Sequence, residues 1–288
     1  MKPGTVTAFC PGHISGYFRR VAGVTSAGTG SVGAGIVISK GVAATVARAD
    51  RTSVCIRRMD ACGKIRELYH DSPPLSTVMG RLGITASVVT ECSLPIGAGF
   101  GLSAAALLAT LTALNRLYFL DMAERDIALY AHETEVLHRT GLGDVAACQG
   151  GGRVVRKGPG VDAAVERRYD LTGPLYAVSF GPIHTPSVLG SQYQMERISS
   201  AFPRTSPKNA EDFFRLSQQF ARASGLVTPE VRQVLQLLAE HHVPASMTML
   251  GNGVFAYGGD ARDLLEQSGE VYEFSMARSG ARITGETR

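Results

Sequence analysis

The stretch Leu94-Pro95-Ile96-Gly97-Ala98-Gly99-Phe100-Gly101-Leu102-Ser103-Ala104-Ala105-Ala106 joins a predicted strand to a predicted helix, and the rest of the chain is organised around it. Residues 84–89 alternate apolar and small polar side chains, and an Ala/Leu-rich run continues to Tyr118 without Pro or Gly. Three glycines in the turn permit positive φ. A glycine turn at a helix N-terminus gathers backbone N–H groups and attracts anions, usually phosphate. An ordinary glycine-rich turn before a buried helix is the alternative.

The composition excludes several classes of protein. With 288 residues, 44% hydrophobic and 19% charged, the chain is long and apolar enough for one or two folded domains. No apolar run approaches the ~20 residues of a membrane span, and the start lacks a signal-peptide core, so we expect a cytoplasmic protein. Five cysteines without a CxxC pair argue against a disulfide framework or a zinc ribbon. The net charge of +4 suits anionic ligands, but scattered Lys and Arg make nucleic-acid binding a weak option.

A second glycine motif near the N-terminus is misleading. Residues 5–9 predict a short strand that the Pro11-Gly12 pair ends, and the segment to Gly35 reads as a loop. Residues 28–33 match the dinucleotide-binding pattern GxGxxG. That fingerprint opens a helix, whereas Gly35 here leads into a β-branched run that favours a strand. We therefore expect a loop, either lining the substrate or plain.

Two acidic residues accompany the second predicted helix, which runs from about Glu124 to Arg139. Glu135 lies on that helix and Asp144 lies just after its end. Locally, Asp144 can be the N-cap of a short helix, and Glu135 can be a solvated residue paired with Arg139 at i,i+4. A functional role for both is the other interpretation.

The composition changes near residues 160–172, and we place a domain boundary there. The predicted domains are 1–165 and 166–288. In the second, the patterns predict helices at 188–200, 210–224 and 229–242, and strands at 174–180, 246–250, 254–257 and 271–277.

The order of these motifs resembles that of the GHMP small-molecule kinases. The shared features are Pro11-Gly12 after the first strand, the loop at 95–105, the Glu-plus-Asp pair and a late glycine motif, Leu250-Gly251-Asn252-Gly253. Residues 9–16, 140–145 and 249–255 are more narrowly similar to the archaeal members of the family that phosphorylate pantoate. The resemblance covers nearly the whole chain.

This resemblance implies an α+β, two-domain GHMP kinase fold. Its N-terminal domain resembles domain 2 of ribosomal protein S5, its C-terminal domain is ferredoxin-like, and the active site lies between them. The implied reaction transfers the γ-phosphate of ATP to the primary hydroxyl of pantoate, in coenzyme A biosynthesis. Phosphoryl transfer requires charge neutralisation, a bridging metal and a group that takes the hydroxyl proton. No GxxxxGK[ST] motif offers a P-loop alternative.

The resemblance also implies roles for particular residues. Asp144 is the expected catalytic base, and Ser103 with Glu135 is the expected pair of Mg²⁺ ligands. For the acceptor we expect His13, Ser31 and Arg153, with Arg156 as an alternative. The expected ATP-binding residues are Pro95, Gly97, Ala98, Gly99, Phe100, Gly101, Leu102, Ser103 and Ala104.

The chain also departs from the family pattern. The glycine loop keeps only the second of two usual serines, His13 replaces a common lysine, and Asn252 interrupts the last glycine motif. Adenine and carboxylate contacts lie outside the matching motifs. A homoserine or isoprenoid-precursor kinase and a non-catalytic ligand sensor therefore stay open. The family resemblance implies a homodimer, and the composition leads us to expect no nucleic-acid or membrane partner.

Overall fold

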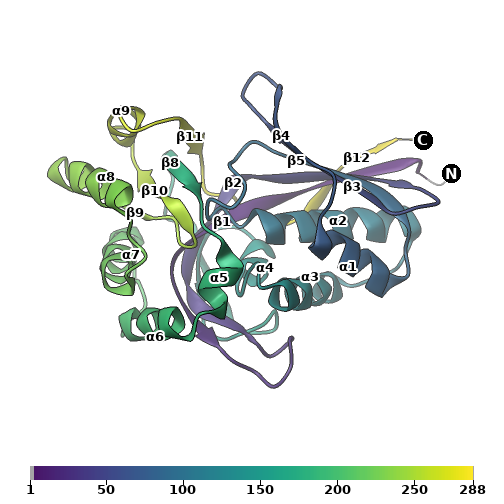
Figure 1. Ribbon diagram of the computed structural model, residues 1–288, viewed down its shortest axis with the longest axis horizontal. Helices are drawn as coiled ribbons and strands as arrows, with labels where there is room; N and C mark the ends of the chain where they lie inside the picture. Colours follow the sequence, from purple (N-terminus) through teal and green to yellow (C-terminus); the bar gives the residue numbers. More distant parts are fainter. Residues whose placement is uncertain (1–2, 288) are drawn as a thin grey trace.

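The computed structural model describes residues 3–287 and contains two β-sheets, each with its own set of helices (Figure 1). The larger sheet has eight strands and the smaller has four. Helices pack on the sheets instead of alternating with parallel strands, which confirms the α+β class. No helix within residues 3–287 has the length and apolar character needed to cross a bilayer.

The larger sheet has the order β12-β1-β2-β5-β3-β4, and β6 joins it by pairing with β2 and β7. Every pair is antiparallel except β3 with β5. Its strands are β1 (Thr5–Val21), β2 (Gly30–Arg48), β3 (Ser53–Met59), β4 (Ile65–Tyr69), β5 (Ala86–Cys92), β6 (Arg153–Arg156), β7 (Val165–Arg168) and β12 (Arg282–Thr287). The last strand thus lies beside the first.

Four helices accompany this sheet: α1 (Pro73–Leu82), α2 (Leu102–Tyr118), α3 (Glu124–His138) and α4 (Asp144–Cys148). The central α2 contacts β1, β2 and α3, and its Ala/Leu-rich sequence buries ten residues. Small alanines allow this close packing on several sides. The predicted helix over 102–118 is confirmed.

The smaller sheet has the order β11-β8-β10-β9 and is antiparallel throughout. Its strands are β8 (Leu175–Pro182), β9 (Ala245–Met247), β10 (Gly251–Tyr257) and β11 (Val271–Phe274). The helices of this part are α5 (Thr185–Gly190), α6 (Gln192–Ala201), α7 (Ala210–Ser224), α8 (Pro229–Glu240) and α9 (Ala261–Glu266). The helix predicted over 188–200 is two helices, because Ser191 ends α5 and caps α6.

The strands predicted at residues 5–9 and after Gly35 are confirmed, but the end of the first strand and the loop that should follow it are wrong. Pro11-Gly12 does not end β1, because a bulge between these residues lets the strand continue, and the supposed loop before Gly35 is the start of β2. A Cβ on Gly35 would lie 2.2 Å from the His13 imidazole, and one on Gly33 would lie 2.2 Å from the Tyr17 carbonyl oxygen. The glycines therefore mark close approach inside a sheet and not a loop.

The two long strands β1 and β2 connect the two hydrophobic cores. Val6 and Val46 pack in the core of the larger sheet, whereas Ile14 and Ile36, further along the same strands, pack in the core that the smaller sheet shares. The predicted domain boundary between residues 165 and 166 falls within β7, and β12 rejoins the larger sheet. The limits 1–165 and 166–288 stay a prediction.

Candidate active site

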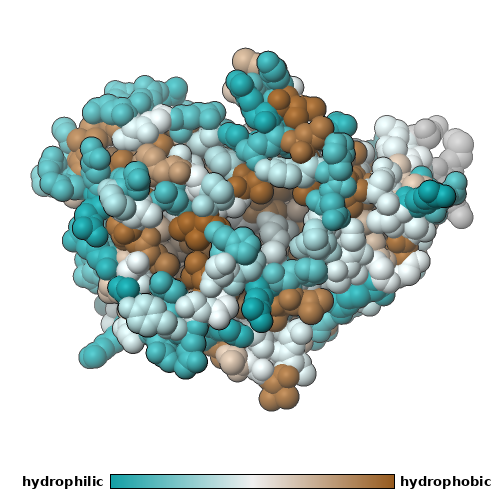
Figure 2. Space-filling model, in the orientation of Figure 1, coloured by the Kyte–Doolittle hydropathy of each residue, from teal (hydrophilic) through white to brown (hydrophobic). Residues whose placement is uncertain are grey.

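A cavity of about 620 Å³ lies where the two parts of the molecule meet. One side is formed by the glycine loop, the start of α2, the end of α3 and the loop before α4, and the other by residues 182–186 and 249–250. Figure 2 shows a hollow on this face, with hydrophobic residues on part of its rim. The glycine loop, Glu135 and Asp144 therefore border one space.

The glycine loop presents a helix N-terminus to this cavity. Gly97, Gly99 and Gly101 have φ of 78°, 83° and 62°, and no side chain caps α2. The first N–H groups of a helix have no acceptor within it. Because the residues at the start of α2 line the cavity, their N–H groups are available to an anion there.

Tertiary contacts hold the glycine loop from two directions. A Cβ on Gly99 would lie 2.8 Å from the Met249 carbonyl oxygen, so the loop packs against the turn before β10. Phe100 packs edge-on against Phe274, with ring centroids 6.2 Å apart, and its carbonyl accepts a hydrogen bond from His13 N at 2.9 Å. The loop thus has a fixed shape before any ligand arrives.

Glu135 is buried and incompletely partnered. Its side chain lines the cavity with 1% exposure, Oε1 accepts a hydrogen bond from Thr140 at 3.0 Å, and Oε2 has no partner. Burial, and then the charge of Asp144, raises the pKa of this carboxyl from 4.5 to about 8, and the nearby hydroxyls of Ser103 and Thr140 lower it by less. The interpretation of Glu135 as a solvated partner of Arg139 is wrong.

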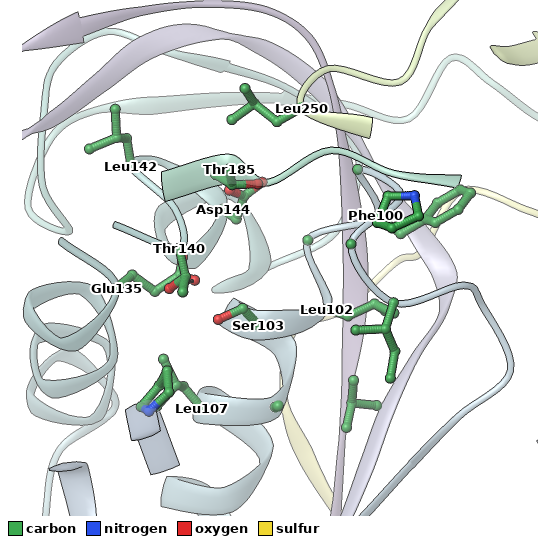
Figure 3. Close-up of a pocket in the computed structure, with 18 of the residues that line it drawn as sticks. Phe100, Leu102, Ser103, Leu107, Glu135, Thr140, Leu142, Asp144, Thr185 and Leu250 are labelled. Atoms are coloured by element: carbon green, nitrogen blue, oxygen red, sulfur yellow. Dashed lines mark hydrogen bonds between the residues drawn. The ribbon is translucent and has the colours of Figure 1, made fainter. Parts of the chain in front are cut away.

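The Ser103 hydroxyl points toward Glu135 and Thr140 (Figure 3). A hydroxyl beside a buried carboxylate with a free oxygen fits Mg²⁺, which takes one or two protein oxygens and completes its shell from phosphates and water. Within residues 3–287 no group of three or more His, Cys, Asp or Glu side chains is arranged around a metal position. A magnesium ion at Ser103 and Glu135 would thus need further ligands.

Asp144 is the first residue of α4, and Gly143 is its N-cap, so the interpretation of Asp144 as a cap is wrong. Its carboxylate accepts a hydrogen bond from His13 Nδ1 at 2.7 Å and remains 23% exposed, toward the cavity. Burial raises the pKa of Asp144, but the hydrogen bond from His13 and the charge of Arg156 outweigh it and lower the pKa. The carboxylate is therefore ionised and available.

His13 is fully buried behind Asp144. It is not one of the residues that line the cavity. Burial lowers its pKa, so the ring is neutral at neutral pH. A neutral ring whose Nδ1–H donates to Asp144 leaves Nε2 free to accept from Arg156 Nη1 at 3.5 Å. His13 contacts the candidate base and is placed to orient it.

Arg156 and Ser31 border the same end of the cavity. Both are buried, with 2% and 3% exposure, and Arg156 Nε and Nη2 have no hydrogen-bond partner. Burial lowers the pKa of Arg156, although Asp144 acts in the opposite direction. A Cβ on Gly143 would lie 2.5 Å from Ser31 Oγ and 2.6 Å from Arg156 Nε, so this glycine makes room for both side chains.

Arg153 has a different environment. It lies three residues before Arg156 on β6, and such a spacing places side chains on opposite faces of a strand. Its guanidinium forms two hydrogen bonds to Asp170, at 3.0 and 2.5 Å, and it is not among the residues around the cavity. Of the two arginines, Arg156 is the one that faces the site.

Several cavity residues were given no role by the sequence: Thr140, Leu142 and Leu250 lie in motifs that pointed to the family, and Thr185 lies in none. Thr140, Leu142, Thr185 and Leu250 surround Asp144 and Glu135 (Figure 3). Leu250 and Thr185 come from segments more than 40 residues after Asp144. Only the packing of the two parts of the molecule brings them to the site.

Comparison with known proteins decides the family. The sequence profile described as "GHMP kinases N terminal domain" matches residues 65–152. A protein named pantoate kinase from Methanospirillum hungatei is 46% identical over 283 residues, which cover 98% of each chain. The chain belongs to the GHMP kinase family. It is therefore an enzyme, an ATP-dependent small-molecule kinase.

Two further proteins are similar over most of this GHMP kinase. A pantoate kinase from Methanocaldococcus jannaschii is 28% identical and covers 86% of this chain and 90% of its own. A solved structure titled "Phosphotransferase related to CoA biosynthesis pathway" has a TM-score of 0.79 and 23% identity, covering 97% and 98% of the two chains. The expected GHMP kinase fold is confirmed.

Proposed function

We propose that this GHMP kinase transfers the γ-phosphate of ATP to the primary hydroxyl of pantoate and produces 4-phosphopantoate for coenzyme A synthesis. One observation carries the proposal: Asp144, ionised and open to the cavity, and Arg156, buried with unpartnered nitrogens, share the cavity with the uncapped N-terminus of α2. Pantoate has a hydroxyl that Asp144 can bind and a carboxylate that can pair with Arg156. The near-full-length identity to a pantoate kinase supports the same substrate.

The nucleotide phosphates are assigned to the glycine loop and the start of α2. Free N–H groups and the positive end of the helix dipole attract the negative charge of the triphosphate. The loop is held by β10, Phe274 and His13, so these donors are already oriented when the nucleotide binds. Preorganised donors stabilise the charge that moves to the leaving phosphate during transfer.

We assign Mg²⁺ to Ser103 and Glu135, because Glu135 Oε2 is buried without a hydrogen-bond partner and Mg²⁺ prefers oxygen ligands of this kind. When bound, the ion neutralises phosphate charge and helps to orient the γ-phosphate. Glu135 and Asp144 repel each other when both are ionised in this buried space. A cation at Glu135 would therefore favour the ionised form of both carboxyls.

Asp144 is the proposed general base. Its carboxylate orients the C4 hydroxyl of pantoate and accepts the proton as the new O–P bond forms and the bond from the γ-phosphorus to the bridging oxygen of ADP breaks. His13 holds the carboxylate through Nδ1–H and supports it as a positioning residue. Here His13, expected from the sequence to bind substrate, acts through Asp144.

Arg156 and Ser31 are the proposed ligands of the pantoate carboxylate. A guanidinium with two unpartnered nitrogens can form a charge-assisted pair with a carboxylate, and the adjacent hydroxyl can add a donor. Arg153 is not included, because Asp170 occupies its guanidinium.

The test is ADP release measured with pantoate, homoserine, mevalonate and no acceptor, with Asp144→Asn as the inactive control. We expect turnover above the blank with pantoate only, and almost none in the variant. Turnover with another acceptor but not with pantoate would contradict the substrate assignment, and no turnover with any acceptor would support a ligand sensor. Cytoplasmic location and a homodimer stay predictions.

A further inference from the structure

The turn between β9 and β10 contains a strained residue at the cavity. Leu250 has φ of 61°, a left-handed conformation that residues with a Cβ seldom adopt. Its side chain is partly buried, packs against the core and lines the cavity. Such strain persists only where the surrounding structure holds it, and it gathers at ligand sites.

A second leucine borders the same part of the cavity. Leu142 has 8% exposure, lies two residues before Asp144 and belongs to the core against which Leu250 packs. Figure 3 shows both leucines on the same side of Asp144, Leu142 from the loop before α4 and Leu250 from the turn before β10. Both side chains are apolar and line the cavity near the candidate base, and one comes from each part of the molecule.

The chemistry of the proposed acceptor requires an apolar surface at this position. Pantoate has a carboxylate at C1 and the reactive hydroxyl at C4, and between them C3 carries two methyl groups that can form no hydrogen bonds. If Arg156 and Asp144 hold the two polar ends, C3 lies between them and next to the wall. Covering the methyl groups with apolar side chains removes apolar surface from water and stabilises the complex. A polar side chain at the same place would lose its hydrogen bonds to water without gaining a partner.

We propose that Leu142 and Leu250 form a wall that receives the two C3 methyl groups and selects pantoate over hydroxy acids that lack them. This inference rests on the proposed function and adds the residues that determine specificity. The strained backbone of Leu250 is then the feature that turns its side chain toward the substrate.

The test compares kcat/KM for pantoate with kcat/KM for 2,4-dihydroxybutanoate, which has the same polar groups and no methyl groups. Burial of two methyl groups predicts a preference of about fifteenfold for pantoate in the wild type. In Leu250→Ala and in Leu142→Ala the preference should fall to about fourfold, because half of the wall is lost. The matched control is Leu264→Ala, a partly buried leucine of the same core away from the cavity. It should keep the wild-type preference.

Folding is checked by melting each variant. If Leu250→Ala is too unstable to assay, Leu250→Gly replaces it, since glycine accepts the positive φ without strain. The proposed role of the two leucines would be wrong if the wild type had equal kcat/KM for the two acids, or if Leu250→Ala kept the wild-type preference. Either result would leave the proposed phosphorylation of pantoate intact. Absence of any turnover with pantoate would instead overturn the proposed function and the wall together.

Discussion

The two ends of the cavity are built in different ways. At the proposed nucleotide end, one continuous segment, residues 97–104, offers backbone N–H groups, and apart from the Ser103 hydroxyl its side chains contribute little besides packing. At the proposed acceptor end, single side chains come from four elements: His13 from β1, Ser31 from β2, Asp144 from α4 and Arg156 from β6.

This difference determines how each end responds to substitution. A backbone site depends on the conformation of the chain, so a change there alters binding and stability together. A side-chain site depends on individual functional groups, so an isosteric change can remove the chemistry and leave the fold intact. The predictions below test this contrast.

The largest effect is expected for Asp144→Asn. Asparagine keeps the shape and can accept a hydrogen bond from His13, but it cannot take the hydroxyl proton. We expect kcat to fall by roughly 10²-fold or more, with unchanged melting temperature and ATP affinity. Turnover within about threefold of wild type in a folded variant would show that Asp144 is not the base.

Gly99→Val should affect the nucleotide end through the backbone. Valine resists the φ of 83°, and its Cβ would lie 2.8 Å from the Met249 carbonyl oxygen, so the loop must move. We expect ATP affinity to fall at least ~30-fold and stability by about 1–3 kcal/mol. Calorimetry and melting measure these changes.

The matched control for this substitution is Gly63→Val. Gly63 has φ of 76° but no atom within 4 Å of an added Cβ. Its substitution therefore introduces the backbone strain of a positive φ without a steric clash. Its variant should lose some stability and keep the wild-type ATP affinity. Equal ATP affinity in Gly99→Val and wild type would remove the loop from the nucleotide site.

Glu135→Gln should raise the Mg²⁺ concentration for half-maximal activity by about tenfold, the scale of one lost charged ligand. The control is Glu133→Gln, which removes a carboxylate of the same helix that pairs with Arg81 on the surface. It should leave the Mg²⁺ requirement unchanged. A shared titration curve for wild type and Glu135→Gln would exclude Glu135 as a metal ligand.

The same substitution predicts a pH effect without metal. Since the folded pKa of Glu135 is raised from 4.5 to about 8, its stabilising contribution is full below pH 4.5 and is lost as pH rises through 8. Above pH 8 the wild type holds a buried charge that glutamine lacks. Glu135→Gln should then melt above wild type in the absence of Mg²⁺ and nucleotide.

The smallest effect is expected at His13. His13→Ala removes the hydrogen bond to Asp144, which should lower kcat about tenfold and raise the pKa of Asp144, moving the acid limb of the kcat profile to higher pH. His13→Asn places an amide N–H near the position of Nδ1 and should stay within about threefold of wild type. Equal losses in both variants would make His13 a packing residue only.

Local patterns predicted much of the fold. The Ala/Leu run of α2, the amphipathic α7 and the strands of the smaller sheet have the apolar periods and end signals expected of their classes. The prediction was wrong where glycine and proline serve sheet packing, as at Pro11-Gly12 and Gly35, because a close approach between strands depends on the neighbouring strand and not on the local sequence.

By itself, the sequence determined the glycine loop before α2, the presence of Glu135 and Asp144 after it, and the resemblance that names the family. Each of these is local, or depends only on the order of motifs. The tertiary structure decided that His13 forms a hydrogen bond with Asp144, that Arg156 rather than Arg153 faces the cavity, and that Leu142 and Leu250 line the same cavity. Those relations depend on strand register and on packing between the two parts of the molecule. Contacts between residues distant in the chain leave no periodic pattern in the sequence.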